Sequence, residues 1–415
     1  MHSFLLAYSG GLDTSVAIHW LRHRYRAEVH CLIVDVGQEE DLEEIQSRAL
    51  RNGAKSVVVH DAREEFARDY VFKMLPGHPA YEYSYLLGSA ISRPLIAKHL
   101  FETGAALQVE ALAHGATGKG NDQFRFELSL AALGNTRPVI APWREWSFGS
   151  RSDLVDYAAQ HDVALEENTT VEKPLSIDRN LVHTSYEGDL LEDPERPAPT
   201  HAFDRVRDFE DATEAGADMT ISFRKGLPVA VDGANLSPLA LMVQLNQLGS
   251  DNAIGRTDHV ESRFIGMKSR NVYETPGLTI LYAAHRAAEA MCLDKEVLFL
   301  KEELMPRYAR QIYDGLWFTK QREMVQASLD AGNETVNADI SLHLERGTIT
   351  ITRRHSESSL YDVQLSSIEE DRDFDHTDAT GYIRLLSTSV KFQPKQSVDV
   401  AYPRVSPEIP ARRPA

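Results

Sequence analysis

The sequence predicts an α/β protein in which an amino-terminal doubly wound parallel sheet precedes an α+β second domain and a carboxyl-terminal arm. Short apolar runs alternate with helical patterns over roughly the first 160 residues, as expected for parallel strands buried on both faces. Alternating runs joined by tight turns follow beyond about residue 166, which is typical of antiparallel hairpins. The last stretch becomes acidic and then rich in proline, so it offers little material for a core of its own.

The elements of the first domain follow from these periodicities. Strands are expected at residues 4–7, 29–36, 56–60, 109–114 and 139–141. Helices are expected around residues 16–21, 42–50, 64–74, 91–102, 124–133 and 154–160, and Gly53 and Gly104 are expected to end two of them. Doubly wound sheets bind ligands at the carboxyl ends of their strands, so the loops that follow the strands are expected to converge on one site.

The second domain is expected to combine hairpins with helices. One hairpin pairs residues 219–223 with 227–231, and another pairs 341–344 with 348–352. Helical patterns lie near residues 238–248, 278–291 and 297–313. We predict three parts, namely residues 1–165, 166–365 and 366–415. The last part, with its acidic run at 369–373 and its proline-rich end, suits an arm that packs on a neighbouring subunit.

Composition narrows the class of partner and the compartment. The net charge of −18 argues against a nucleic-acid partner, because neutralising phosphates requires a dense basic face. Only two cysteines are present, Cys31 and Cys292, which excludes a disulfide framework and a cysteine-rich metal site. The sequence shows no basic leader and no run of eighteen apolar residues, so we expect a cytoplasmic protein without a membrane partner.

The turn at residues 8–15, Tyr-Ser-Gly-Gly-Leu-Asp-Thr-Ser, joins the first strand to the first helix. Gly10 and Gly11 allow the backbone to approach a ligand closely, while Ser9, Thr14 and Ser15 add hydroxyl groups. The unpaired amides at the start of the following helix favour an anion. The turn is therefore interpreted as a cradle for pyrophosphate.

Asp13 is the unexpected member of this turn, because a carboxylate repels phosphates unless a divalent cation lies between them. We interpret it as a Mg²⁺ ligand. The alternative is an ordinary turn with Asp13 as the helix N-cap. The turn is neither a Walker A loop nor a dinucleotide fingerprint, and the other glycine-rich candidate, residues 115–120, ends in Gly where Ser or Thr is required.

A second polar constellation spans residues 114–127, His-Gly-Ala-Thr-Gly-Lys-Gly-Asn-Asp-Gln-Phe-Arg-Phe-Glu. Such a loop can bind a zwitterion, with Asp122 accepting an ammonium and Thr117, Asn121 and Arg125 binding carboxylates or amides. The alternative is the start of a helix with Asn121 or Asp122 as N-cap and Arg125 exposed.

The turn at residues 9–15 resembles the PP-loop of the ATP pyrophosphatases, and the remaining motifs narrow this resemblance. The chain as a whole resembles the argininosuccinate synthase family, from residue 4 to about residue 385. The motifs that carry the resemblance are residues 7–15, 115–122, Trp143, 176–181, 185–187, 261–270, 273–276 and 377–381.

The resemblance implies a role for individual residues. ATP would be bound by Ala7, Tyr8, Ser9, Gly10, Gly11, Leu12, Asp13, Thr14, Ser15, Val34 and Gly115, of which Ser9, Asp13 and Thr14 would act in catalysis. Aspartate would be bound by Thr117, Asn121 and Asp122. Citrulline would be bound by Tyr85, Ala90, Asn121, Arg125, Ser176, Ser185, Glu261 and Tyr273. The family often has Ser where this chain has Ala90, so that position can offer only a backbone contact, with Ser89 adjacent.

The implied reaction joins citrulline to aspartate through a citrullyl-adenylate, with ATP as substrate, Mg²⁺ as cofactor and a homotetramer as the assembly. Ser176 and Ser185 lie in a segment of little periodicity, which is expected to be a loop that presents their hydroxyls.

Two rival classes share the first motif. A tRNA-thiolating enzyme requires a thiol relay and a basic face, which two separated cysteines and an acidic chain do not provide. A non-catalytic nucleotide-binding module would have no use for the polar residues of the second domain.

Overall fold

The computed structural model describes residues 2–166, 175–199, 203–366 and 375–393. The chain divides into two compact units, residues 1–360 and residues 361–415. The three-part division predicted from the sequence, with boundaries near residues 165 and 365, stays a prediction. Both predicted substrate-binding regions, before and after residue 166, belong to the first unit.

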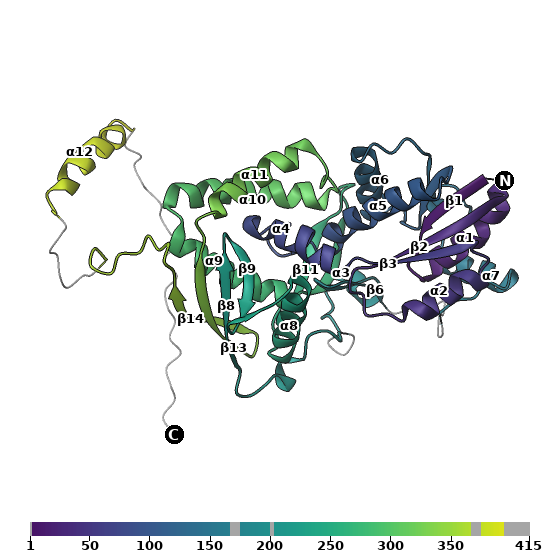
Figure 1. The fold of residues 1–415 in the computed structure, drawn as a ribbon, viewed down its shortest axis with the longest axis horizontal. Helices are drawn as coiled ribbons and strands as arrows, with labels where there is room; N and C mark the ends of the chain where they lie inside the picture. The colour runs from purple at the N-terminus through teal and green to yellow at the C-terminus, as the bar shows by residue number, and fades with distance from the viewer. Residues whose placement is uncertain (1, 167–174, 200–202, 367–374, 394–415) are drawn as a thin grey trace, which may run out of the picture. The chain divides into compact units, whose positions relative to one another are not determined.

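A five-stranded parallel sheet forms the amino-terminal part, which confirms the predicted α/β class (Figure 1). Its strand order is β3-β2-β1-β4-β5, with every neighbouring pair parallel. The strands are β1 (His2–Ala7), β2 (Ala27–Asp35), β3 (Ser56–Asp61), β4 (Ala111–His114) and β5 (Val139–Ile140). The chain reverses its direction of strand addition between β1 and β4, and at such a point the loops after the two strands part and leave a crevice for a ligand.

Both faces of this sheet are buried, because successive side chains point to opposite sides of a strand. Leu5 packs into one core with residues of α5, whereas Leu6 packs into another with residues of α1, α2 and α7. Figure 1 shows α5 and α6 on one side of the strands and α1, α2 and α7 on the other. The helices are α1 (Leu12–Tyr25), α2 (Leu42–Arg51), α5 (Gly88–Ala106), α6 (Asp122–Ala132) and α7 (Arg151–Gln160).

Two of the predicted helices differ in detail from those observed. Gly104 does not end α5, which continues to Ala106. The glycine lies inside the helix, where an added Cβ would be 2.6 Å from the side chain of Leu112 in the sheet. The helix predicted at residues 64–74 is interrupted. It consists of α3 (Arg63–Glu65), a π-helical turn (Phe66–Val71) and α4 (Phe72–Met74), followed by a short 3₁₀ turn (Leu75–Gly77).

The second part of the unit contains an antiparallel sheet of five strands in the order β10-β9-β8-β13-β14. Both predicted hairpins are confirmed in it, β8 with β9 and β13 with β14. The strands are β8 (Ala217–Arg224), β9 (Leu227–Val231), β10 (Ala234–Asn235), β13 (Ala338–Glu345) and β14 (Thr348–His355). The accompanying helices are α8 (Pro238–Asp251), α9 (Pro276–Cys292), α10 (Lys295–Tyr313) and α11 (Lys320–Asn333), the last of which was not predicted.

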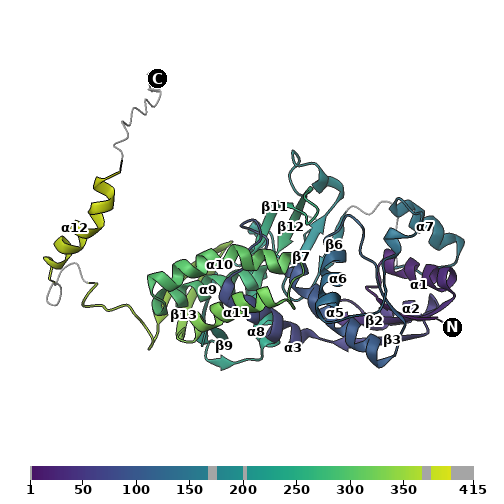
Figure 2. The ribbon, with the colours of Figure 1, turned by 90° about the horizontal axis from the view of Figure 1, so that it is seen from above.

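A third sheet was missed by the sequence analysis. Its order is β11-β12-β7-β6, and all its pairs are antiparallel. The strands are β6 (Ser176–Arg179), β7 (Thr184–Glu187), β11 (Arg256–Ser262) and β12 (Lys268–Glu274). Figure 2 shows this sheet between the parallel-sheet part and helices α9–α11. The expectation that Ser176 and Ser185 lie in a loop is therefore wrong, since both stand on strands.

A main-chain hydrogen bond connects the parallel sheet to this third sheet. Leu181, in the turn between β6 and β7, donates its N–H to the carbonyl of Val36, just after β2, at 2.8 Å. Arg205 donates to the carbonyls of Asn180 and Leu181 at 2.6 and 3.0 Å and holds that turn from the other side. Asn180 also donates its side-chain amide to the carbonyl of Gly88, at the start of α5.

The second unit contains α12 (Asp378–Lys391). Large apolar side chains of this segment are solvent exposed, including Tyr382, Ile383, Leu385, Leu386, Val390 and Phe392. The acidic run at 369–373 and the proline-rich end lie outside the described residues. Among the described residues, no helix has both the length and the apolar character that a membrane crossing requires.

Candidate active site

One cavity of about 950 Å³ lies in the first unit, near the upper end of the size range of small-molecule sites. Its wall comes from the turn after β1, the end of β2, the loop after β4, the first half of α5 and the third sheet. The predicted site residues that line it are Ala7, Tyr8, Ser9, Gly10, Gly11, Asp13, Thr14, Val34, Tyr85, Gly115, Thr117, Asn121, Asp122, Arg125, Ser176, Ser185, Glu261 and Tyr273. Leu12, Ser15 and Ala90 are not among the lining residues.

The turn after β1 is held in shape by its own hydroxyl groups. Ser9 and Thr14 are 3.1 Å apart through their side-chain oxygens, and Thr14 donates to the carbonyl of Gly11 at 3.2 Å. Gly10 has a φ of +79°, a conformation that favours glycine. Ser15 faces the interior and is hydrogen-bonded to the hydroxyl of Tyr8 at 3.1 Å. Ser15 therefore supports the turn, whereas Ser9 and Thr14 are the hydroxyls that reach the cavity.

The N-cap of α1 is Gly11, so the alternative of Asp13 as the N-cap is wrong. Asp13 lies in the first turn of α1 and lines the cavity. No side chain caps the backbone amides at the start of α1, and these amides carry the positive end of the helix dipole. This is the arrangement that a phosphate group satisfies.

The loop after β4 approaches the same turn closely. A Cβ added at Gly115 would lie 2.6 Å from Cγ2 of Thr14, so only glycine fits there without a shift. Both polar atoms of the Asn121 side-chain amide are hydrogen-bonded. It donates to the hydroxyl of Tyr313 at 2.8 Å and accepts from the N–H of Phe264 at 2.8 Å. The start of α6 is thus hydrogen-bonded to the end of α10 and to the turn between β11 and β12.

Four charged side chains alternate in sign across the cavity wall. Arg93 donates to Asp122 at 2.9 Å and to Asp178 at 2.7 Å, and Arg125 donates to Asp122 at 2.9 Å. Burial by itself raises the pKa of Asp122, but the two guanidinium groups outweigh it and the pKa is lowered. Asp122 therefore stays a carboxylate, and Arg125 is buried, contrary to the alternative in which it is exposed.

Arg93 and Asp178 were not assigned a role from the sequence. Arg93 is a single cation within an otherwise uncharged first half of α5, directly before Pro94. An arginine within this uncharged stretch was the one available signal for a polar function. Asp178 belonged to a quoted motif, but only its neighbour Ser176 received a role.

Strand register explains why the third sheet presents polar groups to the cavity. Residues directly opposite each other in an antiparallel pair project to the same face. The opposite pairs are Ser176 with Glu187, Asp178 with Ser185, Ser185 with Tyr273, Glu187 with Asn271 and Glu261 with Ser269, and all of them line the cavity. The sheet thus supplies a continuous polar wall.

Two tyrosines hold the buried carboxylate of Glu261. Tyr273 donates to one carboxylate oxygen at 2.7 Å, and Tyr313 donates to the other at 2.8 Å. Burial, and then the charge of Glu261, raise the pKa of Tyr273 well above its ordinary value, so its phenol stays protonated as a donor. Tyr85 stacks on Tyr273 with ring centroids 4.3 Å apart. Tyr313, at the end of α10, was missed because a terminal helical tyrosine gives no sequence signal.

The backbone contact expected of Ala90 stays a prediction. The N–H of this residue donates to the hydroxyl of Tyr85 at 3.1 Å, and the residue is buried. Ser89, its neighbour, lines the cavity instead. Ser89 is also 2.9 Å from Nε2 of the buried His183.

Two family models match the chain. The N-terminal HUP domain of arginosuccinate synthase matches residues 3–164, and the C-terminal domain of arginosuccinate synthase matches residues 175–393. The first match covers the part with the parallel sheet, and the second begins just before the third sheet. Both parts contribute residues to the cavity wall.

Curated relatives match over nearly their full lengths. The argininosuccinate synthase of Bartonella tribocorum is 48% identical over 382 residues, which is 92% of this chain and 93% of the relative. That of Caulobacter vibrioides is 48% identical over 395 residues, covering 94% of this chain and 97% of the relative. Among solved structures, the U34-tRNA thiolase NcsA from Methanococcus maripaludis is 13% identical over 41% of this chain and 60% of that chain, with a TM-score of 0.26, too low to support an argument. The family models and the relatives together show that this chain belongs to the argininosuccinate synthase family, whose members are ligases that form a C–N bond.

Proposed function

We propose that this chain ligates citrulline and aspartate to argininosuccinate in arginine biosynthesis, converting ATP to AMP and pyrophosphate. The observation that carries the proposal is the composition of one cavity wall, in which the turn after β1, the loop after β4 and the third sheet meet. A phosphate-binding turn alone would serve many nucleotide enzymes. Its combination with two zwitterion-binding regions fits three substrates that react together.

The reaction comprises two displacements. The ureido oxygen of citrulline attacks the α-phosphorus of ATP, and the bond to the bridging oxygen breaks so that pyrophosphate leaves with the electron pair. The uncharged α-amine of aspartate then attacks the activated carbon of the citrullyl-adenylate, and AMP leaves. The amine loses its proton to pyrophosphate or to a substrate group, and we assign no side chain as the base. Positioning of such reactants is worth about 7–11 kcal/mol of barrier lowering.

The nucleotide is assigned to the turn after β1. Ser9, Thr14 and the amides at the start of α1 bind the outer phosphates, and Val34 contacts the base. Gly115 allows the nucleotide to approach the loop closely. Leu12 and Ser15 act on ATP through the backbone of the turn, since their side chains are buried.

The amino acids are assigned to the opposite wall. Thr117, Asn121 and Asp122 bind aspartate, and Arg93 holds Asp122 in place for it. Glu261 receives the ammonium of citrulline, while Arg125, Ser176 and Ser185 bind its polar atoms. Tyr85 and Tyr273 complete this pocket, and Ser89, which lines the cavity, supplies the hydroxyl that Ala90 lacks.

Mg²⁺ suits the carboxylates on the nucleotide side of the cavity. Asp13, Glu40 and Glu44 line it, and carboxylate oxygens together with phosphate oxygens are the ligands that Mg²⁺ prefers. The ion would neutralise phosphate charge, and we assign Asp13 as its protein ligand.

The rival functions are less well supported. A tRNA-thiolating enzyme needs a reactive thiol, but Cys31 is buried and burial raises the pKa of its thiol, so it stays unreactive. A non-catalytic nucleotide-binding module would leave Glu261 and its two tyrosine donors without a purpose.

Product analysis of the purified protein tests the proposal. With ATP, Mg²⁺, citrulline and aspartate, we expect AMP and pyrophosphate in equal amounts, and neither when one amino acid is omitted. ADP and orthophosphate, or no nucleotide product, would contradict it. Asp13→Asn should reduce pyrophosphate release at least 100-fold, while citrulline binding measured by calorimetry changes little. Unchanged turnover of this variant would remove Asp13 from the mechanism.

We further propose a cytoplasmic homotetramer. The two cysteines are both free thiols, which suits a reducing compartment. The exposed apolar side chains of α12 suit a helix that is covered by a neighbouring subunit.

A further inference from the structure

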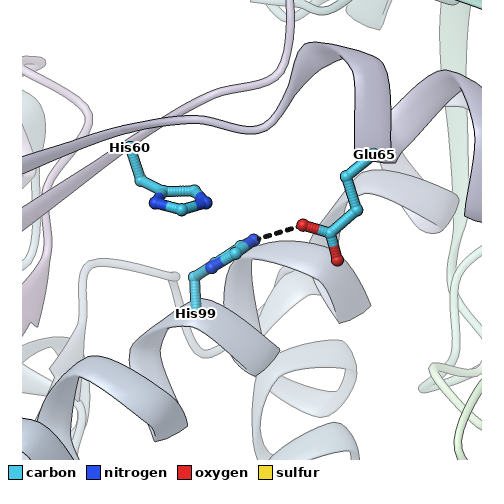
Figure 3. Close-up of side chains that lie close together, drawn as sticks. All are labelled: His60, Glu65 and His99. Atoms are coloured by element: carbon cyan, nitrogen blue, oxygen red, sulfur yellow. Dashed lines mark hydrogen bonds and ion pairs between the residues drawn. The ribbon is translucent and has the colours of Figure 1, made fainter.

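Two histidines and a glutamate converge on the outside of the parallel sheet, away from the residues that line the cavity. Figure 3 shows His60 at the end of β3, Glu65 on α3 and His99 on α5, with their polar ends directed toward one another. Nε2 of His99 is 2.9 Å from Oε2 of Glu65, and the two imidazole rings have centroids 4.0 Å apart. One potential ligand atom from each of the three residues lies within 4.8 Å of the other two.

We propose that His60, Glu65 and His99 bind a Zn²⁺ ion. Two imidazole nitrogens and one carboxylate oxygen form a donor set that zinc favours, and three protein ligands leave a fourth position for water. Zinc bonds of 2.0–2.1 Å at tetrahedral angles place ligand atoms roughly 3.3 Å apart. His60 is exposed and Glu65 is half-buried, so their side chains have room for the small rotations that close this gap.

Of the two neighbouring charges, the ammonium of Lys98 opposes a cation but is 33% exposed, so water screens it, whereas the carboxylate of Glu102 supports one. Lys98 donates to the other oxygen of Glu65 at 2.7 Å, which leaves Oε2 directed at the histidines. Oε2 of Glu102 lies 3.9 Å from Nδ1 of His99. A carboxylate that accepts from the second ring nitrogen of a metal-binding histidine fixes its tautomer and its orientation.

A second cluster, His78, His285 and Glu289, has similar spacing but does not suit a cation. Its three side chains are buried, and Lys301 is paired directly with Glu289. A divalent ion there would lie beside a buried ammonium with no water to screen the repulsion. His78 and His285 are instead hydrogen-bonded to each other at 2.8 Å.

The proposed ion would link the edge strand β3 to α5. The first half of α5 carries Ser89 and Arg93, which line the cavity, while His99 lies two turns further along the helix. The site would therefore stabilise a helix on which the cavity depends, without touching substrate.

Calorimetric titration of the full chain, first stripped of metal with a chelator, tests the proposal. We expect one zinc per chain with micromolar or tighter affinity, and a visible absorption band typical of tetrahedral Co²⁺ when cobalt replaces zinc. His60→Gln and Glu65→Gln should each weaken binding at least tenfold. Zinc should raise the melting temperature of the unaltered chain but not of these variants.

His19→Gln is the matched control, because His19 lies in a separate group of imidazoles with His23 and His161. It should bind zinc as the unaltered chain does. Binding only at millimolar zinc, or binding that is lost in His19→Gln and kept in His60→Gln, would overturn the proposal. Circular dichroism without metal confirms that each variant is folded, so loss of binding reports the ligands themselves.

Discussion

Gly115 and Gly118 are three residues apart in one loop, yet their surroundings differ. A Cβ at Gly115 would lie 2.6 Å from Cγ2 of Thr14, whereas a Cβ at Gly118 would meet nothing within 4 Å. Thr14 lies in the first turn of α1 and is buried, so it has little room to move away. The close approach of the two loops is thus set by the absence of one methyl group.

Gly115→Ala is expected to displace Thr14 and to raise the KM for ATP at least tenfold, with a loss of about 1–3 kcal/mol in unfolding free energy from overpacking. The KM for citrulline should change less than twofold, because Thr14 lies on the nucleotide side. Steady-state kinetics with each substrate varied in turn measures both values.

Gly118→Ala is the control for this substitution, since its Cβ would project into open space. It should leave all three KM values within twofold of the unaltered chain. Equal effects from the two substitutions would show that loop flexibility, and not contact with Thr14, determines nucleotide affinity.

At the scale of single residues, the sequence predicted those whose functional partners are adjacent to them in the chain. Gly10 and Gly11 are read from a turn whose glycines and hydroxyls are adjacent in the chain. Arg93 and Tyr313 were beyond reach, because their partners Asp178 and Glu261 lie far away in sequence and only the fold brings them together.

The end of α10 acts as a connector between the two walls of the cavity. The hydroxyl of Tyr313 donates to Glu261 and accepts from Asn121, and its carbonyl accepts from Arg125 at 2.9 Å. Its ring stacks on Tyr81, with centroids 3.6 Å apart and an interplanar angle of 7°. One helix terminus therefore positions residues that we assign to both amino-acid substrates.

Tyr313→Phe keeps the ring stacking but removes a donor from a buried carboxylate, at a cost of about 1–3 kcal/mol. We expect kcat/KM for citrulline to fall between about tenfold and about 100-fold, which corresponds to that cost. Initial rates at varied citrulline concentration check this expectation.

Tyr308→Phe removes a buried hydroxyl from the same helix, where it donates to Gln326 away from the cavity. It should lower stability to a similar degree and leave the kinetics unchanged. If Tyr308→Phe impaired citrulline use as strongly as Tyr313→Phe, general loosening of α10 would explain both results.

The failure to predict the strands of the third sheet has one physical cause. Strands β6, β7, β11 and β12 line a polar cavity, so they lack the apolar alternation by which a half-buried strand is recognised. The five parallel strands were predicted because both of their faces are apolar. Strands that line a polar binding site therefore lack the sequence pattern by which strands are identified. Only a family resemblance drew attention to Ser176 and Ser185.

Buried histidines make the whole molecule sensitive to acid. Burial lowers the pKa of His183 and of His285 to about 3, and lowers that of His78 well below its ordinary value. Between roughly pH 6.5, the unfolded value, and pH 3, the unfolded chain binds protons that the folded chain does not. Stability therefore falls as the pH drops through this window and is unaffected by these groups above it.

Each such histidine contributes a slope of about 1.4 kcal/mol per pH unit within the window. His183→Gln should reduce the slope by about that amount, as measured by urea unfolding between pH 4.5 and pH 7. His355→Gln, at an exposed position, is the control and should leave the slope unchanged. Parallel slopes for the unaltered chain and His183→Gln would show that other groups govern acid unfolding.

The bond from Leu181 to the carbonyl of Val36 has a consequence for how this chain meets its ligands. Main-chain atoms join the two halves of the pocket here, which favours one relative placement before anything is bound and so reduces the ordering entropy lost on association. This connection opposes a change of width by rotation of one half against the other. A change of preferred amino acid would therefore have to come from exchanging individual side chains along the polar wall, leaving the backbone where it stands.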